Sequence, residues 1–117
     1  MRDKRYYCAV ELAVDVIGPK WRPIILAYLK EGVRRYGELR RRMPDISEKM
    51  LVQRLRELEA DGLIRRTAHD VVPPRVEYEL TEEGWTLAPV LQALYDWAEG
   101  HARRTGSRIE PVAGWST

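Results

Sequence analysis

The most constraining segment of the chain runs from Ser47 to Gly62, because it predicts an amphipathic helix with a marked beginning and a marked end. Ser47 is a good N-cap, and Gly62 can take the left-handed conformation in which helices often end. Leu51, Leu55 and Leu58 recur at i, i+4 and i+7, so one face of this helix is expected to pack on a core. The opposite face is polar and is expected to stay open.

Helix patterns precede this segment, and strand patterns follow it. The elements expected before it are helices over 8–17, 20–30 and 37–43, with a short extended piece over 33–36. Residues 63–69 are expected to form a strand, and residues 75–80, which alternate polar and apolar, a second strand. A turn with two prolines joins the two strands, and a last helix is expected from 81 to about 104. Two short helices around a turn, followed by a hairpin, form a winged helix-turn-helix, so the fold class expected is α+β.

The length of 117 residues allows one domain, assigned here to residues 1–105, with a flexible C-terminal tail over 106–117. A single cysteine excludes an internal disulfide and a cysteine-rich metal site, so no metal and no other cofactor is expected. The chain has no glycine-rich phosphate loop and no nucleophile with a plausible base, which argues against an enzyme. It also has no run of about 18 apolar residues and no signal peptide, so the expected location is the cytoplasm.

The formal net charge of +2 conceals an uneven distribution. Residues 1–66 carry 16 Lys and Arg against 10 Asp and Glu, whereas residues 67–117 carry 4 against 8. The first part is therefore at +6 and the second at −4. Such asymmetry indicates a basic face for a polyanion, although a solvated surface with unevenly placed charges is the alternative.

The outward face of the capped helix offers side chains suited to DNA. Lys49, Gln53 and Arg56 lie on it at i, i+4 and i+7, with Met50, Arg54 and Glu57 at its margins. Lysine and arginine can neutralise phosphates or bind guanine edges, and glutamine can make paired hydrogen bonds to adenine. The helix N-terminus adds free N–H groups suited to a phosphate. The alternative is that these residues serve only solubility, but the position after a basic helix and before a hairpin favours DNA reading.

Basic residues also flank the expected reading helix. Five arginines lie within residues 34–42, and the hairpin adds His69 and Arg75 near its tip, where a wing can follow a minor groove or a phosphate strand. A metal-binding role is not expected for this histidine, because the other histidine and the single cysteine are distant in sequence. The predicted DNA-binding residues are Arg35, Tyr36, Arg40, Arg41, Ser47, Lys49, Met50, Gln53, Arg54, Arg56, His69 and Arg75.

An ordered set of motifs gives the chain a family likeness. The motifs are Cys8-x-Val10-Glu11, Asp15-Val16-Ile17-Gly18-x-Lys20-Trp21, Gly32-Val33-Arg34-Arg35-Tyr36-Gly37-Glu38-Leu39-Arg40, the run from Ile46 to Ile64, and Pro73-Pro74-Arg75-Val76-Glu77-Tyr78-x-Leu80-Thr81. Over about residues 8–98 the chain resembles the HxlR-type winged-helix regulators, relatives of the MarR regulators. It departs from the usual pattern at Ala9, Pro19 and Tyr36, where the family has proline, glycine and phenylalanine.

The resemblance implies a sequence-specific transcriptional regulator, with repression as the expected action. It also implies a homodimer on a near-palindromic DNA operator, with extra N- and C-terminal helices forming the dimer interface. The last helix agrees, since apolar residues nearly surround it and two packing partners would explain them; a fully buried helix in a monomer is the alternative. The alternative function is a winged-helix protein-interaction module that does not read DNA. The predicted interface residues are Val10, Val14, Ile17, Leu87, Val90, Leu91, Leu94, Tyr95 and Trp97.

The resemblance further makes Cys8 a candidate redox sensor, because a matching cysteine senses oxidants or electrophiles in several family members. Sensing requires a thiolate, which the upstream residues Arg2, Lys4 and Arg5 and the start of the first helix favour. The alternative is a small apolar residue in the dimer interface. A small aromatic effector is a separate possibility, bound among aromatic residues that are otherwise core: Trp21, Tyr28, Trp85 and Tyr95.

Overall fold

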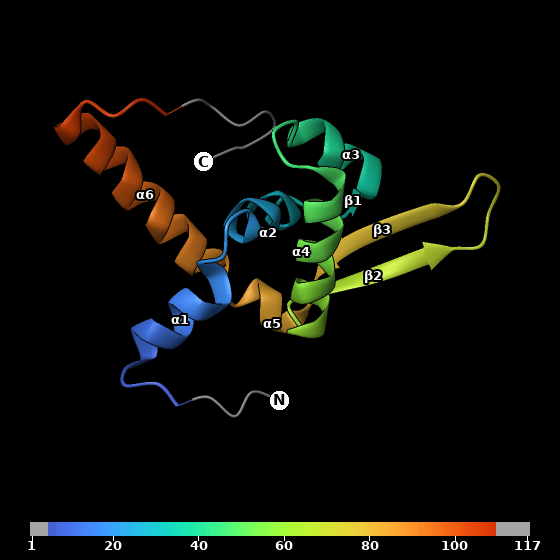
Figure 1. Cartoon of the computed structure of the whole chain (residues 1–117), viewed down its shortest axis with the longest axis horizontal. Helices are drawn as coiled ribbons and strands as arrows, with labels where there is room; N and C mark the ends of the chain where they lie inside the picture. The colour runs from blue at the N-terminus through green and yellow to red at the C-terminus, as the bar shows by residue number, and fades with distance from the viewer. Residues whose placement is uncertain (1–4, 110–117) are drawn as a thin grey trace.

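A computed structural model describes residues 5–109 of the chain. In chain order its elements are α1 (Ala9–Ile17), α2 (Arg22–Lys30), β1 (Arg34–Arg35), α3 (Tyr36–Arg42), α4 (Glu48–Ala60), β2 (Ile64–His69), β3 (Arg75–Leu80), α5 (Glu82–Trp85) and α6 (Ala88–Thr105). Helices α3 and α4 form the helix-turn-helix, and the β2–β3 hairpin forms the wing (Figure 1). The predicted α+β winged helix-turn-helix is confirmed. Residues 1–4 and most of the predicted tail, 110–117, lie outside the described residues.

The wing belongs to a three-stranded antiparallel sheet with the order β1-β3-β2. Strands β2 and β3 pair from Ile64 opposite Leu80 to His69 opposite Arg75, so the predicted hairpin is present. Strand β1 adds two residues on the other edge of β3. A strand this short shows no alternation, so the sequence indicated an extended piece here but not its partner. The pairing places the start of α3 next to the wing.

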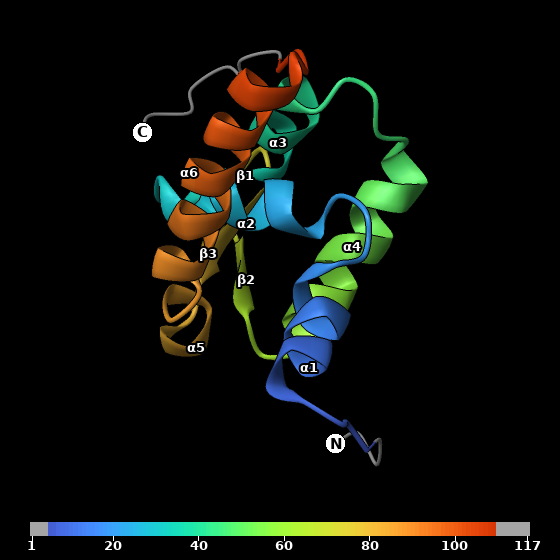
Figure 2. The ribbon, with the colours of Figure 1, turned by 90° about the vertical axis from the view of Figure 1, so that its left-hand side faces the viewer.

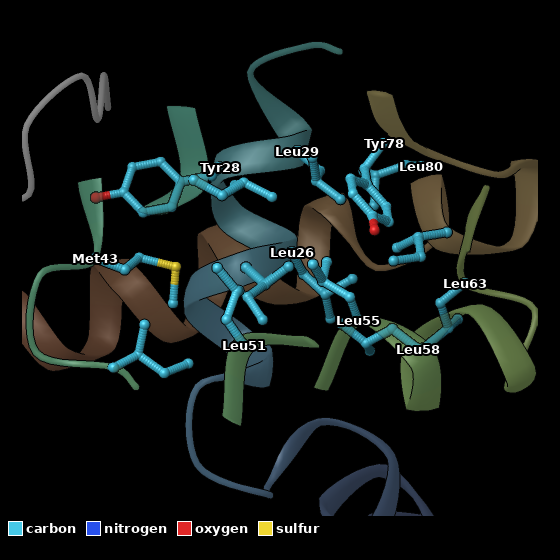
Figure 3. Close-up of a cluster of buried hydrophobic side chains, with 14 of the residues drawn as sticks. Leu26, Tyr28, Leu29, Met43, Leu51, Leu55, Leu58, Leu63, Tyr78 and Leu80 are labelled. Atoms are coloured by element: carbon cyan, nitrogen blue, oxygen red, sulfur yellow. The ribbon is translucent and has the colours of Figure 1, made fainter. Parts of the chain in front are cut away.

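The core gathers around α2, whose Leu26 and Leu29 are fully buried. Leu51, Leu55 and Leu58 of α4 belong to the same cluster and are at most 1% exposed, which confirms the predicted core face (Figure 3). Side chains from β2 and β3 close the cluster on the side of the sheet. Burial of this one leucine stripe fixes the rotation of α4 about its axis, so the opposite face of the helix points outward.

Both ends of α4 are set by signals that the sequence carries. The Ser47 hydroxyl accepts a hydrogen bond from the Met50 N–H at 3.1 Å, which confirms Ser47 as the N-cap. Gly62 follows the C-terminal end with a φ of 78°, a conformation that glycine adopts without a steric cost. Thr81 donates its hydroxyl to the Gly62 carbonyl at 2.6 Å. The end of α4 is therefore joined to the end of the wing.

The boundaries of α1 and α3 differ from the prediction by one residue, and two other helices differ by more. Helix α2 begins at Arg22 rather than at residue 20, because Trp21 takes a left-handed φ of 81° through which a right-handed helix cannot run. The helix predicted from 81 to about 104 is divided into α5 and α6. Pro89 explains the division, since proline lacks an N–H and clashes with the carbonyl four residues earlier, so it is tolerated only in the first turn of α6.

Helices α1 and α6 lie on the side opposite the wing (Figure 1), the side that faces the viewer in Figure 2. Helix α6 packs on α2, and its Leu91 is only 5% exposed. Leu91 therefore belongs to the core of the subunit, while Ile17 and Leu87 pack partly against that core; the interface role of these three residues stays a prediction. The other predicted interface residues are half-buried Tyr95 and five residues that are 40–68% exposed, Val10, Val14, Val90, Leu94 and Trp97.

Within the described range, no helix is long and apolar enough to cross a bilayer.

A buried arginine joins three helices near the end of α1. Arg22, the first residue of α2, is 5% exposed. Its guanidinium donates hydrogen bonds to the carboxylates of Glu57 at 2.9 Å and Asp61 at 3.0 Å, and to the Val16 carbonyl at 2.9 Å. Glu57 lies in α4, Asp61 ends it, and Val16 lies in α1. One side chain therefore ties α1 and α2 to α4.

Replacing Arg22 should destabilise the protein because two carboxylates lose the cation that they share. We expect Arg22→Met to lower the free energy of unfolding by about 2 kcal/mol, less than for a fully buried pair. The expected loss is smaller than for a fully buried pair because the side chains of Glu57 and Asp61 are 29% and 23% exposed. Urea denaturation measures the change. Arg65→Met is the control, because its pair with Glu79 is exposed and should contribute less than about 1 kcal/mol. Equal losses in the two variants would contradict this role of Arg22.

Candidate DNA-binding interface

The outward face of α4 presents Lys49, Gln53 and Arg56, all of them exposed. These three residues, called the reading stripe below, lie opposite the buried leucines of the same helix, as their spacing predicted. Ser47 is also exposed at the N-cap, beside the N–H groups of the first helical turn. The stripe can therefore meet base edges, while the start of the helix can meet a phosphate.

Two residues at the margins of the stripe are less exposed than the stripe itself, and their role in DNA binding stays a prediction. Met50 is half-buried and packs against the core. Arg54 points toward the body of the protein, where Nη1 lies 2.9 Å from the Glu57 carboxylate and Nε donates to the Lys20 carbonyl at 2.9 Å. With a side chain that is only 17% exposed, Arg54 holds the fold together rather than facing outward.

The predicted backbone-contacting residues of α3 divide in the same way. Arg35 at the N-cap and Arg41 on the helix are exposed. Arg40 instead donates to the Ile46 carbonyl at 2.6 Å, so it fixes the turn between α3 and α4. The Glu38 carboxylate accepts a hydrogen bond from the Arg35 N–H at 3.0 Å, and this bond, with the charges of neighbouring arginines, lowers the pKa of Glu38. Arg35 and Arg41 are thus the residues of this segment that are open to a phosphate.

The wing brings its two predicted residues together. His69 ends β2 and lies directly opposite Arg75, which begins β3. Both lie close to one carboxylate, since His69 Nε2 is 2.6 Å from Glu77 Oε1 and Arg75 Nε is 3.8 Å from Glu77 Oε2. Glu77 therefore gathers both side chains onto one face of the hairpin.

A groove of 1030 Å³ lies between the wing and the helices α3 and α4. Two carboxylates, Glu48 and Glu59, line it together with apolar side chains of α4 and the wing tip. Arginines outnumber these carboxylates and come from β1, α4, β2 and β3, so the groove suits an anionic strand. The arginines that line it are Arg35, Arg56, Arg66 and Arg75.

Two buried polar atoms of the groove have no hydrogen-bond partner among the described residues. They are the Tyr36 hydroxyl oxygen and Arg75 Nε; Arg34 Nε shares this property but lies outside the lining. Burial, and to a lesser extent the charge of Glu48, raises the pKa of Tyr36, so the hydroxyl stays protonated near neutral pH.

Sequence reasoning placed Glu57 at the margin of the reading stripe but missed its contacts, which connect α4 to α2. Its carboxylate accepts hydrogen bonds from Gln53, Arg54 and Arg22. The spacing of four and three residues within α4 was a signal for the first two contacts. The third comes from a residue 35 positions away, and no local pattern indicates it.

Cys8 is an exposed free thiol at the N-cap of α1. Two of the cations expected to favour its thiolate, Arg2 and Lys4, lie outside the described residues. Within residues 5–109, no group of three or more His, Cys, Asp and Glu residues is arranged to hold a metal ion. The structure therefore places Cys8 on the surface of a predicted interface helix.

The aromatic residues considered as an effector site differ in how far they are buried. Tyr28 lies in the core, where its hydroxyl donates to the Arg42 carbonyl at 3.1 Å, and Trp21 packs against the same core. Trp85 is 47% exposed on α5. An effector site among these aromatic residues stays a prediction.

A family model described as HxlR-like helix-turn-helix matches residues 16–106, which span α2 to α6 and every residue of the groove. The chain belongs to the HxlR family. As an HxlR protein it is a DNA-binding transcriptional regulator related to the MarR regulators, not an enzyme. The resemblance read from the motifs is thereby confirmed.

Individual relatives agree with the HxlR assignment. The HTH-type transcriptional regulator YtcD of Bacillus subtilis (strain 168) is 49% identical over 104 residues, covering 89% of this chain and 82% of YtcD. The solved structure of the redox regulator HypR in its reduced form has a TM-score of 0.81 at 42% identity, covering 86% of this chain and 100% of HypR. A MarR-family regulator from Porphyromonas gingivalis W83 has a TM-score of 0.77 at 34% identity, covering 85% and 97%.

Proposed function

We propose that this HxlR protein is a homodimeric repressor that binds a near-palindromic operator and responds to oxidants through Cys8. The observation that carries the proposal is the exposed reading stripe of α4 beside an arginine-lined groove under the wing. A repressor acts where the chromosome lies, so we infer a cytoplasmic location.

The reading stripe enters the major groove, and one DNA strand passes between α4 and the wing. Gln53 and Arg56 then meet base edges, because they project from the middle of the exposed face. In the groove, Arg35 and Arg75 donate to phosphates, which fixes the position of α4 on the duplex. A small-molecule effector that displaces DNA would find room in the same groove.

The dimer forms through α1 and α6. Val10, Val14, Leu94 and Trp97 are 47–68% exposed, and large apolar side chains gathered in this way mark an interaction surface. A twofold dimer through this side leaves the wings at the opposite side (Figure 1). Two reading helices about 34–36 Å apart would then match successive major grooves of a near-palindrome.

Cys8 joins this interface to redox chemistry. It is exposed at the start of α1, and HypR, which is named a redox regulator, shares the fold at 42% identity. Two Cys8 thiols, one from each subunit, can form a disulfide with release of two protons, and the oxidant takes up the two electrons. A new bond between the two α1 helices would change how the two reading stripes are spaced.

Substitutions in the reading stripe should act on base preference. We expect Gln53→Ala and Arg56→Ala each to weaken operator binding by about 1–3 kcal/mol and to relax base preference. Arg41→Ala should weaken binding to all DNA sequences. It should also reduce the slope of log affinity against log salt concentration by about one, because one phosphate contact fewer releases about one counterion fewer. Fluorescence anisotropy measures both effects, with a duplex selected from a random library and an unrelated duplex. If no DNA binds even at low salt, the protein-interaction module becomes the better function.

A charge within the exposed apolar surface should disrupt the dimer. We expect Leu94→Glu and Trp97→Glu to sediment as monomers, because the dimer would bury an unpaired carboxylate. Val33→Glu is the control, since Val33 is 47% exposed but lies outside α1 and α6. Sedimentation velocity measures the state of each variant, and a monomeric wild-type protein would refute the dimer.

Oxidation should act through Cys8 alone. We expect diamide to link wild-type subunits into a covalent dimer and to lower operator affinity, with both effects reversed by dithiothreitol. Cys8→Ser should show neither effect, because no second cysteine exists in the chain. Non-reducing electrophoresis and anisotropy follow the two changes. A Cys8→Ser protein that still loses DNA on oxidation would eliminate the sensor role.

A further inference from the structure

Gln53 lies in the middle of the reading stripe, yet its side chain already has a partner within the protein. Its Nε2 donates to Glu57 Oε2 at 3.2 Å, one turn further along α4. An ionised carboxylate can only accept hydrogen bonds, so the amide nitrogen and not the amide oxygen faces Glu57. Gln53 therefore keeps its oxygen Oε1 and one N–H for other partners, in a defined orientation.

Glu57 is itself held firmly. Arg22, which is 5% exposed, contacts Glu57 Oε1 at 2.9 Å, and Arg54 contacts Oε2 at 2.9 Å. Burial acts to raise the pKa of Glu57, but hydrogen bonds from Arg22 and Gln53 and the charges of the two arginines outweigh it and lower the pKa. The carboxylate stays ionised near neutral pH and remains an acceptor for Gln53.

The purine edges in the major groove make different demands on such an amide. Adenine presents the N6 amino donor beside the N7 acceptor, whereas guanine presents the two acceptors O6 and N7. An amide with its oxygen and one N–H available matches adenine. Guanine would require two N–H groups, and one of those of Gln53 is engaged by Glu57.

We propose that Glu57 determines base specificity through Gln53, by holding the Gln53 amide in the orientation that selects adenine over guanine. The inference rests on the proposed DNA-reading function. Glu57 is a positioning residue, because it acts through Gln53. Its anchor reaches beyond α4, since the Arg22 guanidinium that contacts Glu57 also donates to the Val16 carbonyl of α1 at 2.9 Å. The fold as a whole, and not α4 alone, sets the orientation of the reading amide.

The test compares wild type with Glu57→Gln, a variant of the same shape whose side-chain amide can donate as well as accept. Duplexes selected from a random library identify the base pair read by residue 53, as the one whose preference disappears in Gln53→Ala. Wild type should bind adenine at this position about tenfold more tightly than guanine, the size of one paired contact. In Glu57→Gln the amide of Gln53 is released, so this ratio should fall toward one. Fluorescence anisotropy measures both ratios.

Asp61→Asn is the matched control. Asp61 shares the Arg22 guanidinium at 3.0 Å but lies about two turns from Gln53, so this variant should keep the wild-type ratio. Circular dichroism establishes that both variants are folded. An unchanged ratio in Glu57→Gln, or a wild-type protein that prefers guanine or reads no base through Gln53, would overturn the inference and leave DNA binding intact. A wild-type protein that selects no sequence would overturn the proposed function as well.

Discussion

The buried guanidinium of Arg22 is the constraint on which the arrangement of the helices depends. Removing a charged group from water costs several kcal/mol unless partners replace the water, and here two carboxylates and a carbonyl do so. The partners come from α1 and from the C-terminal half of α4, so neither helix can shift without leaving a buried charge unpaired. The left-handed conformation of Trp21 lies in the same junction, with Arg22 on one side and the Lys20 carbonyl, bound by Arg54, on the other. These contacts offset the cost of holding a bulky residue in that conformation.

The contacts around Arg22 also show that the basic residues of the first half of the chain serve two purposes, holding the fold and facing DNA. Arg22, Arg40 and Arg54 donate hydrogen bonds to carboxylates and carbonyls within the fold. Arg41 and the cations of the reading stripe remain open on the surface. The excess of positive charge in residues 1–66 therefore overstates the charge available to DNA, because part of it holds the helix-turn-helix together. What distinguishes the DNA-facing side is where the exposed cations lie, around one groove and one helix face.

The elements that could be predicted from the sequence are those specified by local residue patterns. The leucine stripe, the Ser47 cap and the alternating strands specify the helix-turn-helix and the wing, and all three appear in the structure. Contacts between residues far apart in the chain could not be predicted from such local patterns. The pairing of β1 with β3 and the contact of Arg22 with Glu57 join residues far apart in the chain, and neither leaves a periodic signal. The division between α5 and α6 was predictable in principle, since Pro89 marks it, but the apolar run on both sides concealed it.

Arg54 and Arg56 show why the width of a reading face is harder to predict than its centre. Both are arginines of one helix, two positions apart, and either could reach DNA by residue type alone. Helical periodicity places Arg56 opposite the buried leucines, where only solvent can receive it. Arg54 stands about 100° from Gln53, at a margin where the side chain can turn either way. The acceptors that receive it, Glu57 and the Lys20 carbonyl, decide its direction, and the second belongs to another part of the chain. Periodicity thus fixes which residues lie at the middle of a recognition helix, while the packing around that helix decides which of their neighbours remain available to DNA.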